Sequence, residues 1–402
     1  MDTITQEWKP TVAPSESGSL GERPLKIQFT GSGSEYFRIW IVNLLLSIVT
    51  LSLYRPWAKV RRLRYFYGNT LVDGHALDFH GNPWKMLRGY LLVGALLVCY
   101  SVAGRFSPAA ALAAVAIFAV VFPALLRASM QFRLANTSWR GLRFRFSGSL
   151  GGAYRAMLPL FIPTVLTAVV ALGVADPRLQ PGLYLKCLAW ITLITLVLAP
   201  LVWWNFKRYQ HDHYGLGQWQ TKLTIGPGSM YGLTFKVIGV MVLSCISVFV
   251  VAVIVMVIVI FALGLGTGFN KEALTQNQGT MTVMFGLLGL AFYFFALIVP
   301  VPYAMSRTQN LIWPNTRCDQ LRFDSDLRFA PLTGLTVKNW LLMVCTLGLY
   351  YPFASVAFYR MRVQSITPQL GGDIDLLQAQ AAAAGDASGD AAGDFFGIDI
   401  GL

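Results

Sequence analysis

Long apolar segments alternate with short basic and aromatic segments along most of the chain. The longest apolar runs cover residues 108–126, 156–175, 183–204, 237–263 and 281–305, and a shorter run covers 90–104. A helix that crosses a bilayer needs roughly 20 mainly apolar residues. We therefore expect full membrane spans at 84–104, 108–135, 150–175, 182–210, 229–265 and 281–314.

Two terminal segments, 36–68 and 332–365, have a different pattern. Their apolar parts run into "TLSLYRPWAKVRRLRYFYGNT" (50–70) and "TLGLYYPFASVAFYRMRVQSIT" (346–367), where a proline precedes basic and aromatic residues. Each apolar part is long enough for one span or for two half-helices. We expect broken or re-entrant helices; the alternative, eight simple spans, would place residues 1–24 outside.

Prolines mark an internal repeat, and a search for such repeats fixes an architecture early. Each proline lies near one end of an apolar segment, at Pro56, Pro123, Pro200, Pro302 and Pro352. Thirteen residues later comes a polar residue, at Asn69, Asn136, His213, Asn315 and Ser365. Proline inside a helix removes an i→i−4 hydrogen bond and kinks the helix. We therefore expect a helix kink at each of the prolines.

Short alternating stretches follow the polar residues. "GHALDFHG" (74–81) and "GLRFRFSG" (141–148) alternate apolar and polar positions, and "LKIQFTGSG" (25–33), "TKLTIGPG" (221–228) and "DQLRFDS" (319–325) do so more loosely. This alternation predicts short strands. Open strands cannot lie in hydrocarbon, because their backbone groups would be unpaired there. We expect them on the cytoplasmic face, paired into a small sheet or ring.

The predicted fold is mainly α: a polytopic helical membrane protein built from proline-kinked repeats, with short β-hairpins on the cytoplasmic face. The expected regions are a polar arm (1–24), a first repeat (25–82), three helix pairs each with a hairpin (83–148, 149–228, 229–330), a last broken helix (331–367) and an acidic tail (368–402).

Composition and charge agree with a membrane protein. Apolar residues make up 55% of the chain, charged residues 13%, and the mean hydropathy is +0.54, whereas soluble domains carry about 25% charged residues. The net charge is +13, although residues 371–402 contain six Asp and no Lys or Arg. The positive charge follows the loops on one side, so the positive-inside rule places these loops and the tail in the cytoplasm. We expect no nucleic-acid partner.

Residues 1–24 contain no apolar region typical of a cleavable signal peptide. The cysteines, Cys99, Cys187, Cys245, Cys318 and Cys345, include no CxxC pair and mostly lie in apolar segments. We therefore expect neither a cleaved leader nor a disulfide framework.

The stretch from Phe29 to Gly81, "FTGSGSEYFRIWIVNLLLSIVTLSLYRPWAKVRRLRYFYGNTLVDGHALDFHG", resembles the opening of the YjgN-type family of bacterial inner-membrane proteins. The second block "TLGLYYPFA" and the tail "FGIDIGL" are similar to that family as well. The resemblance implies a multi-pass protein of the bacterial inner membrane. It implies no catalytic residues, because the family has no established activity. Ser52 and Arg55 stand where relatives often have Gly and Ser.

A basic cluster after Pro56 is the main candidate site: Arg55, Lys59, Arg61, Arg62 and Arg64. Trp57, Tyr65, Phe66 and Tyr67 lie between these residues, as in segments at a membrane interface. One interpretation is an anchor to anionic lipids, and the other is a binding groove for an anionic headgroup or acidic ligand. Arg127 and Arg133 are expected to reach lipid phosphates in the same way.

Asn43 and Asn339 are polar residues inside apolar segments, each seven residues before a Thr. Burying an amide in lipid is costly, so we expect each to hydrogen-bond a neighbouring helix; lining a substrate path is the alternative. Asp and Glu are absent from 84–135 and 150–175, which counts against a proton-coupled transporter.

The histidines, His75, His80, His211 and His213, give no convincing metal set. The side chains of "HDH" (211–213) point about 200° apart on a helix, so they could share an ion only in an extended segment. No nucleophile, P-loop or dinucleotide motif is present in a suitable context. We expect no metal, no cofactor and no enzymatic activity.

The tail begins as a low-complexity Ala/Gly/Asp segment but ends in apolar "FFGIDIGL" (395–402). We expect this end to dock on a cytoplasmic surface, with a protein partner as a further possibility. The leading functional hypothesis is binding or transport of a lipid or a small hydrophobic or anionic solute, with anionic membrane lipids as partners. The alternative is a non-transporting scaffold that recruits cytoplasmic proteins. Neither substrate nor oligomeric state follows from the sequence.

Overall fold

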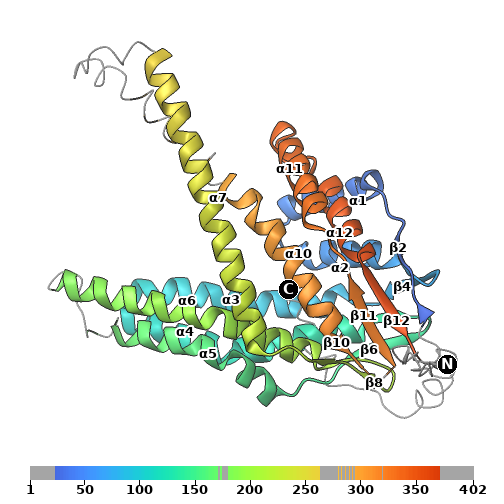
Figure 1. Cartoon of the computed structure of the whole chain (residues 1–402). Helices are drawn as coiled ribbons and strands as arrows, with labels where there is room; N and C mark the ends of the chain where they lie inside the picture. The colour runs from blue at the N-terminus through green and yellow to red at the C-terminus, as the bar shows by residue number, and fades with distance from the viewer. Residues whose placement is uncertain are drawn as a thin grey trace, which may run out of the picture.

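The computed structural model describes residues 23–170, 180–262, 295–318 and 320–371, with Gly173 and a few single positions between 279 and 292. The polar arm before Arg23, the tail after Gly371 and the outer part of the span expected at 281–314 lie outside the described residues. In the described chain, long helices project from a group of short strands (Figure 1).

The described elements form five units of the same order: strand, helix, helix, strand. Unit 1 comprises β2 (Ile27–Phe29), α1 (Gly33–Val49), α2 (Arg55–Gly68) and β3 (Thr70–Val72). Unit 2 comprises β4 (His75–Phe79), α3 (Pro83–Phe106), α4 (Pro108–Ala135) and β5 (Thr137–Trp139). Unit 3 comprises β6 (Leu142–Phe146), α5 (Leu150–Val169), α6 (Pro181–His211) and β7 (Tyr214–Leu216).

Units 4 and 5 complete the series. Unit 4 comprises β9 (Lys222–Leu223), α7 (Pro227–Ala262), α10 (Pro300–Ile312) and β10 (Thr316–Arg317). Unit 5 comprises β11 (Leu321–Ser325), α11 (Phe329–Cys345), α12 (Tyr351–Gln364) and β12 (Ile366–Leu370). Strand β1 (Arg23–Pro24) precedes unit 1, and strand β8 (Trp219–Gln220) lies between units 3 and 4. A 3-10 turn at Trp313–Asn315 joins α10 to β10 within unit 4.

The two strands of each unit pair antiparallel. The chain therefore runs out from the strands through the first helix of the unit and comes back to them through the second. Ile27 pairs with Val72 in unit 1, for example, and Leu321 with Leu370 in unit 5. Units 1 to 3 join through hairpins whose turns use left-handed backbone at Asp73–Gly74 and Arg140–Gly141, as two-residue hairpin turns require.

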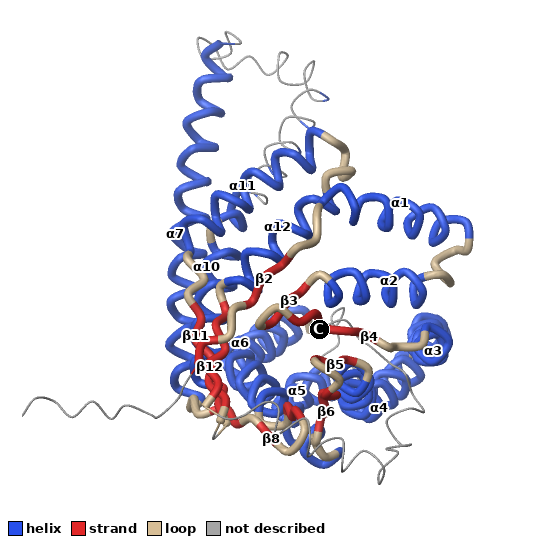
Figure 2. The backbone as a smooth tube through the Cα atoms, turned by 90° about the vertical axis from the view of Figure 1, so that its right-hand side faces the viewer, coloured by secondary structure: helices blue, strands red, loops and turns tan. Residues whose placement is uncertain are grey.

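The described strands form three antiparallel sheets that lie around a ring (Figure 2). Strands β2 to β8 pair in chain order, β9 pairs with β10, and β12 lies between β11 and β1. Only two residues separate β1 from β2, and one residue separates β8 from β9. An apolar cluster joins side chains from several strands of the ring, including Trp139, Leu142, Leu216 and Leu370. The described short strands thus pair into small antiparallel sheets, which confirms that they pair with one another as expected.

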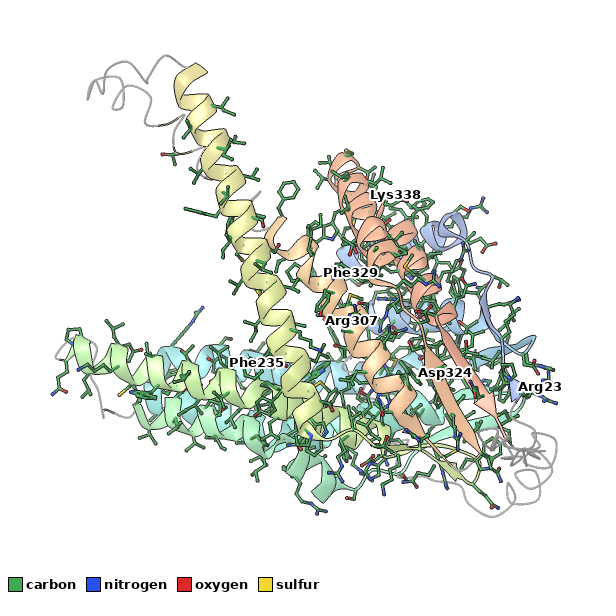
Figure 3. The ribbon with its side chains drawn as sticks, viewed as in Figure 1. Arg23, Phe235, Arg307, Asp324, Phe329 and Lys338 are labelled. Carbon is green, nitrogen blue, oxygen red and sulfur yellow. The ribbon has the colours of Figure 1, made fainter. Side chains whose placement is uncertain are left out.

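The helix pairs project from the ring in different directions (Figure 1). Helices α3 to α6 pack as one bundle, α7 packs against α6 and α10 before its outer part extends away, and α10 also packs against α11. The first and last hairpins close the circle, because α1 packs against α12. In Figure 3, Arg23 and Asp324 lie at the strands, whereas Lys338 lies on the part of α11 that points away from them.

Five helices, α3 to α7, are long and apolar enough to cross a membrane. Their apolar side chains are largely exposed in the protein alone, which is the arrangement expected of surfaces that face lipid. The remaining described pairs, α1–α2 and α11–α12, are shorter hairpins whose connecting residues are apolar and exposed: Leu51 is 89% exposed and Leu347 94%.

These two hairpins have almost the same connection. Thr50 Oγ donates to the carbonyl of Leu46 and accepts from the N–H of Tyr54, and Thr346 makes the equivalent bonds. Leu51 and Leu347 both have a φ of 50°. The expected break in each terminal segment is therefore confirmed.

The predicted proline kinks are wrong at both hairpins. Pro56 and Pro352 are the second residues of α2 and α12, where a missing N–H costs nothing and the fixed φ suits a helix start. Pro302 is the third residue of α10 as described, and Pro123 and Pro200 lie inside α4 and α6. The prolines of the two hairpins start helices instead of bending them.

The polar residue thirteen positions after each proline caps the C-terminal end of the helix that precedes it. The Nδ2 atoms of Asn69, Asn136 and Asn315 each donate to the carbonyl four residues earlier, at 2.8 Å in every case. His213 Nδ1 contacts the Tyr209 carbonyl at 2.8 Å, and Ser365 Oγ donates to the Arg362 carbonyl. These bonds satisfy carbonyls that the end of a helix leaves unpaired, which explains the repeat seen in the sequence.

Replacing Ser52 with Gly should stabilise the protein. Ser52 has a φ of 71°, and Gly348 occupies the equivalent position in the other hairpin with a φ of 89°. A non-glycine residue in left-handed backbone costs about 1–2 kcal/mol, and Ser52→Gly should recover about 1 kcal/mol of it. Thermal unfolding in detergent checks this by a higher melting temperature, with Gly348→Ser as the matched variant that should lower it. A lower melting temperature for Ser52→Gly would contradict the prediction.

Candidate functional site

A cavity of about 910 Å³ lies between α1, α2 and α12. Its walls include the apolar residues Leu44 and Ile48 of α1 and Leu51 of the turn that follows α1. Arg55, Lys59 and Arg62 of α2 line the same cavity. We call this cavity the upper chamber. It combines an apolar wall that reaches the exposed hairpin tip with a basic wall.

A second cavity, of about 760 Å³, lies at the strand ring, and we call it the lower chamber. Strand residues such as Leu77, Phe144 and Trp219 line it together with Arg362 of α12. The two chambers share lining residues, namely Arg62, Tyr67, Arg133, Ser355 and Tyr359. They are therefore adjacent parts of one cavity system that runs from the hairpin to the ring.

The lining of both chambers is basic. Its charged residues are Arg55, Lys59, Arg62, Arg133 and Arg362, and none of the described lining residues is Asp or Glu. Desolvation by burial lowers the pKa of Arg362, so the protein interior disfavours its positive charge. Gln309 holds this side chain in place: Arg362 Nε donates to Gln309 Oε1 at 3.1 Å, and Gln309 Nε2 donates to the Arg362 carbonyl. An anion in the chambers would offset this unfavourable charge.

Tyrosines near this wall stay neutral. Burial raises the pKa of Tyr359 to about 12, and its hydroxyl lies 3.0 Å from Thr70 Oγ. Burial also raises the pKa of Tyr214, which lines the lower chamber. These hydroxyl groups therefore act as hydrogen-bonding groups and add no negative charge.

The helical spacing of α2 divides the predicted basic cluster into two sets. Arg55, Lys59 and Arg62 are four and three residues apart, so they share one helix face, and that face borders the upper chamber. Arg61 and Arg64 do not line either chamber. Arg61 lies over the Tyr54 ring at 5.7 Å, and Arg64 Nη2 donates to the Gly81 carbonyl at 3.4 Å.

The bond made by Arg64 belongs to a set that joins neighbouring units. Arg127 Nε donates to the Gly148 carbonyl at 2.7 Å, Asn310 Nδ2 to that of Leu327 at 3.1 Å, and Arg360 Nη2 to that of Gly31 at 2.7 Å. Each donor lies on the second helix of one unit, and each acceptor lies between the first strand and first helix of the next. Because unit 5 thereby binds unit 1, these bonds close the ring. Arg64 and Arg127 thus make structural bonds that the sequence did not indicate.

Within the part of the chain that the structure describes, the Oδ1 atoms of Asn43 and Asn339 lack the hydrogen bond to a neighbouring helix that the sequence predicted. Both side chains are buried, at 7% and 1% exposure. Asn43 Oδ1 has no hydrogen-bond partner among the described residues, and neither do Asn339 Oδ1 and Nδ2. The surroundings differ, however, since Asn43 lines the upper chamber and Asn339 lines neither chamber. An unpaired acceptor at the chamber wall can bind a hydroxyl or amine of a ligand.

The histidines have structural partners. His211 is buried and contacts Thr316 Oγ through Nδ1 at 2.9 Å, and His80 Nε2 contacts Ser138 Oγ at 2.8 Å. His75 Nδ1 contacts the carbonyl of Asp73. No group of three or more His, Cys, Asp or Glu in the described part of the chain could hold a metal ion.

Several chamber residues lie outside the predicted basic cluster, although Arg133 was expected to reach lipid phosphates. Arg133 and Arg362 stand ten residues after Pro123 and Pro352, so the repeat itself was a signal that could have paired them. Tyr36, Tyr67 and Tyr359 come from three different helices. Only the closure of α12 onto α1 brings them to one wall.

Comparisons with known proteins agree with the architecture. The profile of a family described as bacterial protein of unknown function (DUF898) matches residues 24–395. A protein of Salmonella typhimurium named inner membrane protein YjgN is 26% identical over 373 residues, which cover 87% of this chain and 89% of that protein. The proteins of the same name from Escherichia coli O157:H7 and K12 are each 29% identical over 142 residues, 34% of either chain. No solved structure matches the chain.

Proposed function

The chain belongs to the DUF898 family of bacterial proteins, and we propose that it acts in the inner membrane as a binding protein for an anionic amphiphile, such as an anionic phospholipid. The observation that carries the proposal is the upper chamber, where a basic wall of α2 faces an apolar wall of α1 within about 910 Å³. Pockets for small ligands commonly have volumes of about 300–1,000 Å³.

The basic wall would hold the anionic group. Arg55, Lys59 and Arg62 share one helix face and can converge on a phosphate, and hydrogen bonds between ionised partners are roughly twice as strong as neutral ones. The upper chamber contains no described carboxylate that would compete for these residues. Asn43 Oδ1 offers an acceptor for a ligand hydroxyl.

The apolar wall would hold an acyl chain. Leu44 and Ile48 line the chamber from α1, and Leu51 lines it from the turn that follows. Ile48 and Leu51 are 63% and 89% exposed. Burial of apolar surface contributes about 25 cal/mol per Å², so a chain laid along this wall would add to the affinity. The exposed hairpin tip gives a lipid a route from the bilayer, with the hairpins entering the membrane from the side of the strand ring. The positive-inside rule places that side in the cytoplasm.

Replacing both Arg55 and Arg62 with Gln should abolish retention of the anionic lipid. A hydrogen bond to a charged group contributes about 1.5–3 kcal/mol, so losing two should weaken binding at least roughly a hundredfold. The protein is placed in nanodiscs of equal parts phosphatidylglycerol and phosphatidylcholine, and the lipids retained after release are measured by native mass spectrometry. Wild-type protein should retain phosphatidylglycerol selectively.

The matched control is Arg38→Gln with Arg61→Gln. This double variant loses the same two positive charges as Arg55→Gln with Arg62→Gln. Neither Arg38 nor Arg61 borders either chamber. Selective retention should persist in this control. Equal lipid retention by the wild type and both double variants would overturn the proposal, and co-purification of another protein without selective lipid would favour the scaffold hypothesis instead.

A further inference from the structure

The lower chamber suits an occupant that is both apolar and acidic. Aromatic side chains dominate much of its wall: Phe144, Tyr214, Trp219, Trp313, Phe323 and Phe358. Arg62 and Arg362 face the same space, and no described lining residue is acidic. An occupant therefore has to combine bulky apolar groups with a carboxylate or another anion.

The tail of this chain has that composition. Residues 371–402 contain six Asp and no Lys or Arg, and the segment "DFFGIDIGL" (394–402) combines two Phe, two Ile and a Leu with Asp394 and Asp399. The arm before Arg23 is also acidic, but its apolar residues are scattered, with Trp8, Val12 and Leu20 far apart. The tail is thus the better match to the chamber in both charge and apolar content.

The tail is also tethered beside the chamber. The described chain ends at Gly371, whose N–H donates to the carbonyl of Gln320 at 2.8 Å, and Ile366 of the preceding strand lines the chamber. Twenty-three residues separate Gly371 from Phe395. A flexible chain of that length has a root-mean-square span of roughly 25–30 Å, and such tethers give effective concentrations in the millimolar range. Even a weak intrinsic affinity would then fill the chamber.

We propose that Phe395–Leu402 of this chain occupies the lower chamber, with its Phe and Ile side chains against the aromatic wall and Asp399 beside the Arg62 and Arg362 guanidinium groups. Because Arg62 also lines the upper chamber, the docked tail competes for a residue that an anionic ligand would use. The tail is then a built-in competitor of ligand binding. Its docking depends only on the geometry of the lower chamber, whereas its role as a competitor rests on the proposed lipid binding.

Native Cys318 lines the lower chamber and provides a direct test. In the full-length protein, Cys99, Cys187, Cys245 and Cys345 are changed to Ser, and Ile398 is changed to Cys. Under mild oxidation in detergent, Ile398→Cys should form an intramolecular disulfide with Cys318, identified by mass spectrometry of the linked peptides. Ala383→Cys, in the part of the tail without bulky apolar residues, is the control and should link at least about tenfold more slowly.

Two further variants test the role of Asp399 and the alternative that the N-terminal arm occupies the chamber. Adding Asp399→Lys to Ile398→Cys should slow the link at least about tenfold, because attraction to the arginines becomes repulsion. Equal linking rates for Ile398→Cys and Ala383→Cys would overturn the proposal. So would linking of Trp8→Cys in preference to Ile398→Cys, which would assign the chamber to the N-terminal arm. Because no lipid enters this measurement, failure of lipid binding leaves it unaffected.

Discussion

Replacing Gly148 with Ala should destabilise the protein by about 1–3 kcal/mol, the usual effect of overpacking a core. An added Cβ at Gly148 would lie 2.5 Å from Phe146 Cε1 and 2.6 Å from Tyr209 Oη. Phe146 and Tyr209 are both buried in the same apolar cluster, so neither can simply swing away. The Tyr209 hydroxyl also donates to the Ser149 carbonyl.

The same substitution should weaken the junction between units 2 and 3. The Gly148 carbonyl accepts the bond from Arg127 Nε, so a backbone shift that relieves the clash would lengthen that bond. Gly31 and Gly81 repeat the arrangement: an added Cβ would lie 2.7 Å from Phe29 Cζ and 2.4 Å from Phe79 Cε1. A Phe, one residue and a Gly thus form a repeated packing motif at the end of a strand.

Thermal unfolding in detergent measures the effect, and Gly68→Ala is the matched control. Gly68 ends α2, and nothing lies within 4 Å of a Cβ added there. Ala favours helix over Gly by up to about 1 kcal/mol, so this control should melt at an unchanged or slightly higher temperature. Similar melting temperatures for Gly148→Ala and Gly68→Ala would show that the Phe ring moves without cost.

The repeat could be predicted from the sequence because its causes are local. A strand pattern has a period of two within a few residues, and the polar residue after each proline bonds a carbonyl only three or four residues away. Spans of α3 to α7 follow from hydropathy alone. The break at Thr50 was visible too, because its pattern recurs at Thr346.

The contacts between units could not be predicted, since they depend on which unit lies beside which. The sequence placed Arg64 in the basic cluster at the membrane interface. In the structure it donates to the Gly81 carbonyl, seventeen residues away in the next unit. Arg360 binds a carbonyl at the opposite end of the described chain. The candidate site could be predicted only in part for the same reason. Arg55, Lys59 and Arg62 share a face in any α-helix. That face becomes a cavity wall only because α12 packs on α1.

The two equivalent hairpins therefore differ in what surrounds them. Hairpin α1–α2 presents three basic residues, Arg55, Lys59 and Arg62, to a chamber. The equivalent positions of α12 are Tyr351, Ser355 and Phe358. The hairpin geometry is thus the same in units 1 and 5, whereas only the hairpin of unit 1 carries the basic residues at these positions.

This difference predicts unequal effects for one substitution made at two equivalent positions. Asn339→Asp should destabilise the protein by about 3–5 kcal/mol, the usual cost of an unpaired buried charge. Asn339 is 1% exposed, and its amide has no partner among the described residues. Asn43→Asp adds the same carboxyl at the wall of the upper chamber, where Arg55, Lys59 and Arg62 supply positive charge, so it should cost much less.

Melting temperatures of both variants at pH 8 and pH 5 separate charge from shape. Asp has nearly the shape of Asn, so only the carboxylate charge distinguishes the variants from wild type. That charge is present at pH 8 and is progressively lost as the pH falls, so the deficit of Asn339→Asp should shrink toward pH 5, while Asn43→Asp changes little. Asn339→Leu is the apolar control and should be neutral or stabilising, because it removes both unpaired amide atoms. Equal deficits for the two Asp variants at pH 8 would mean that the basic wall does not act on Asn43, and the chamber would then lose its electrostatic role.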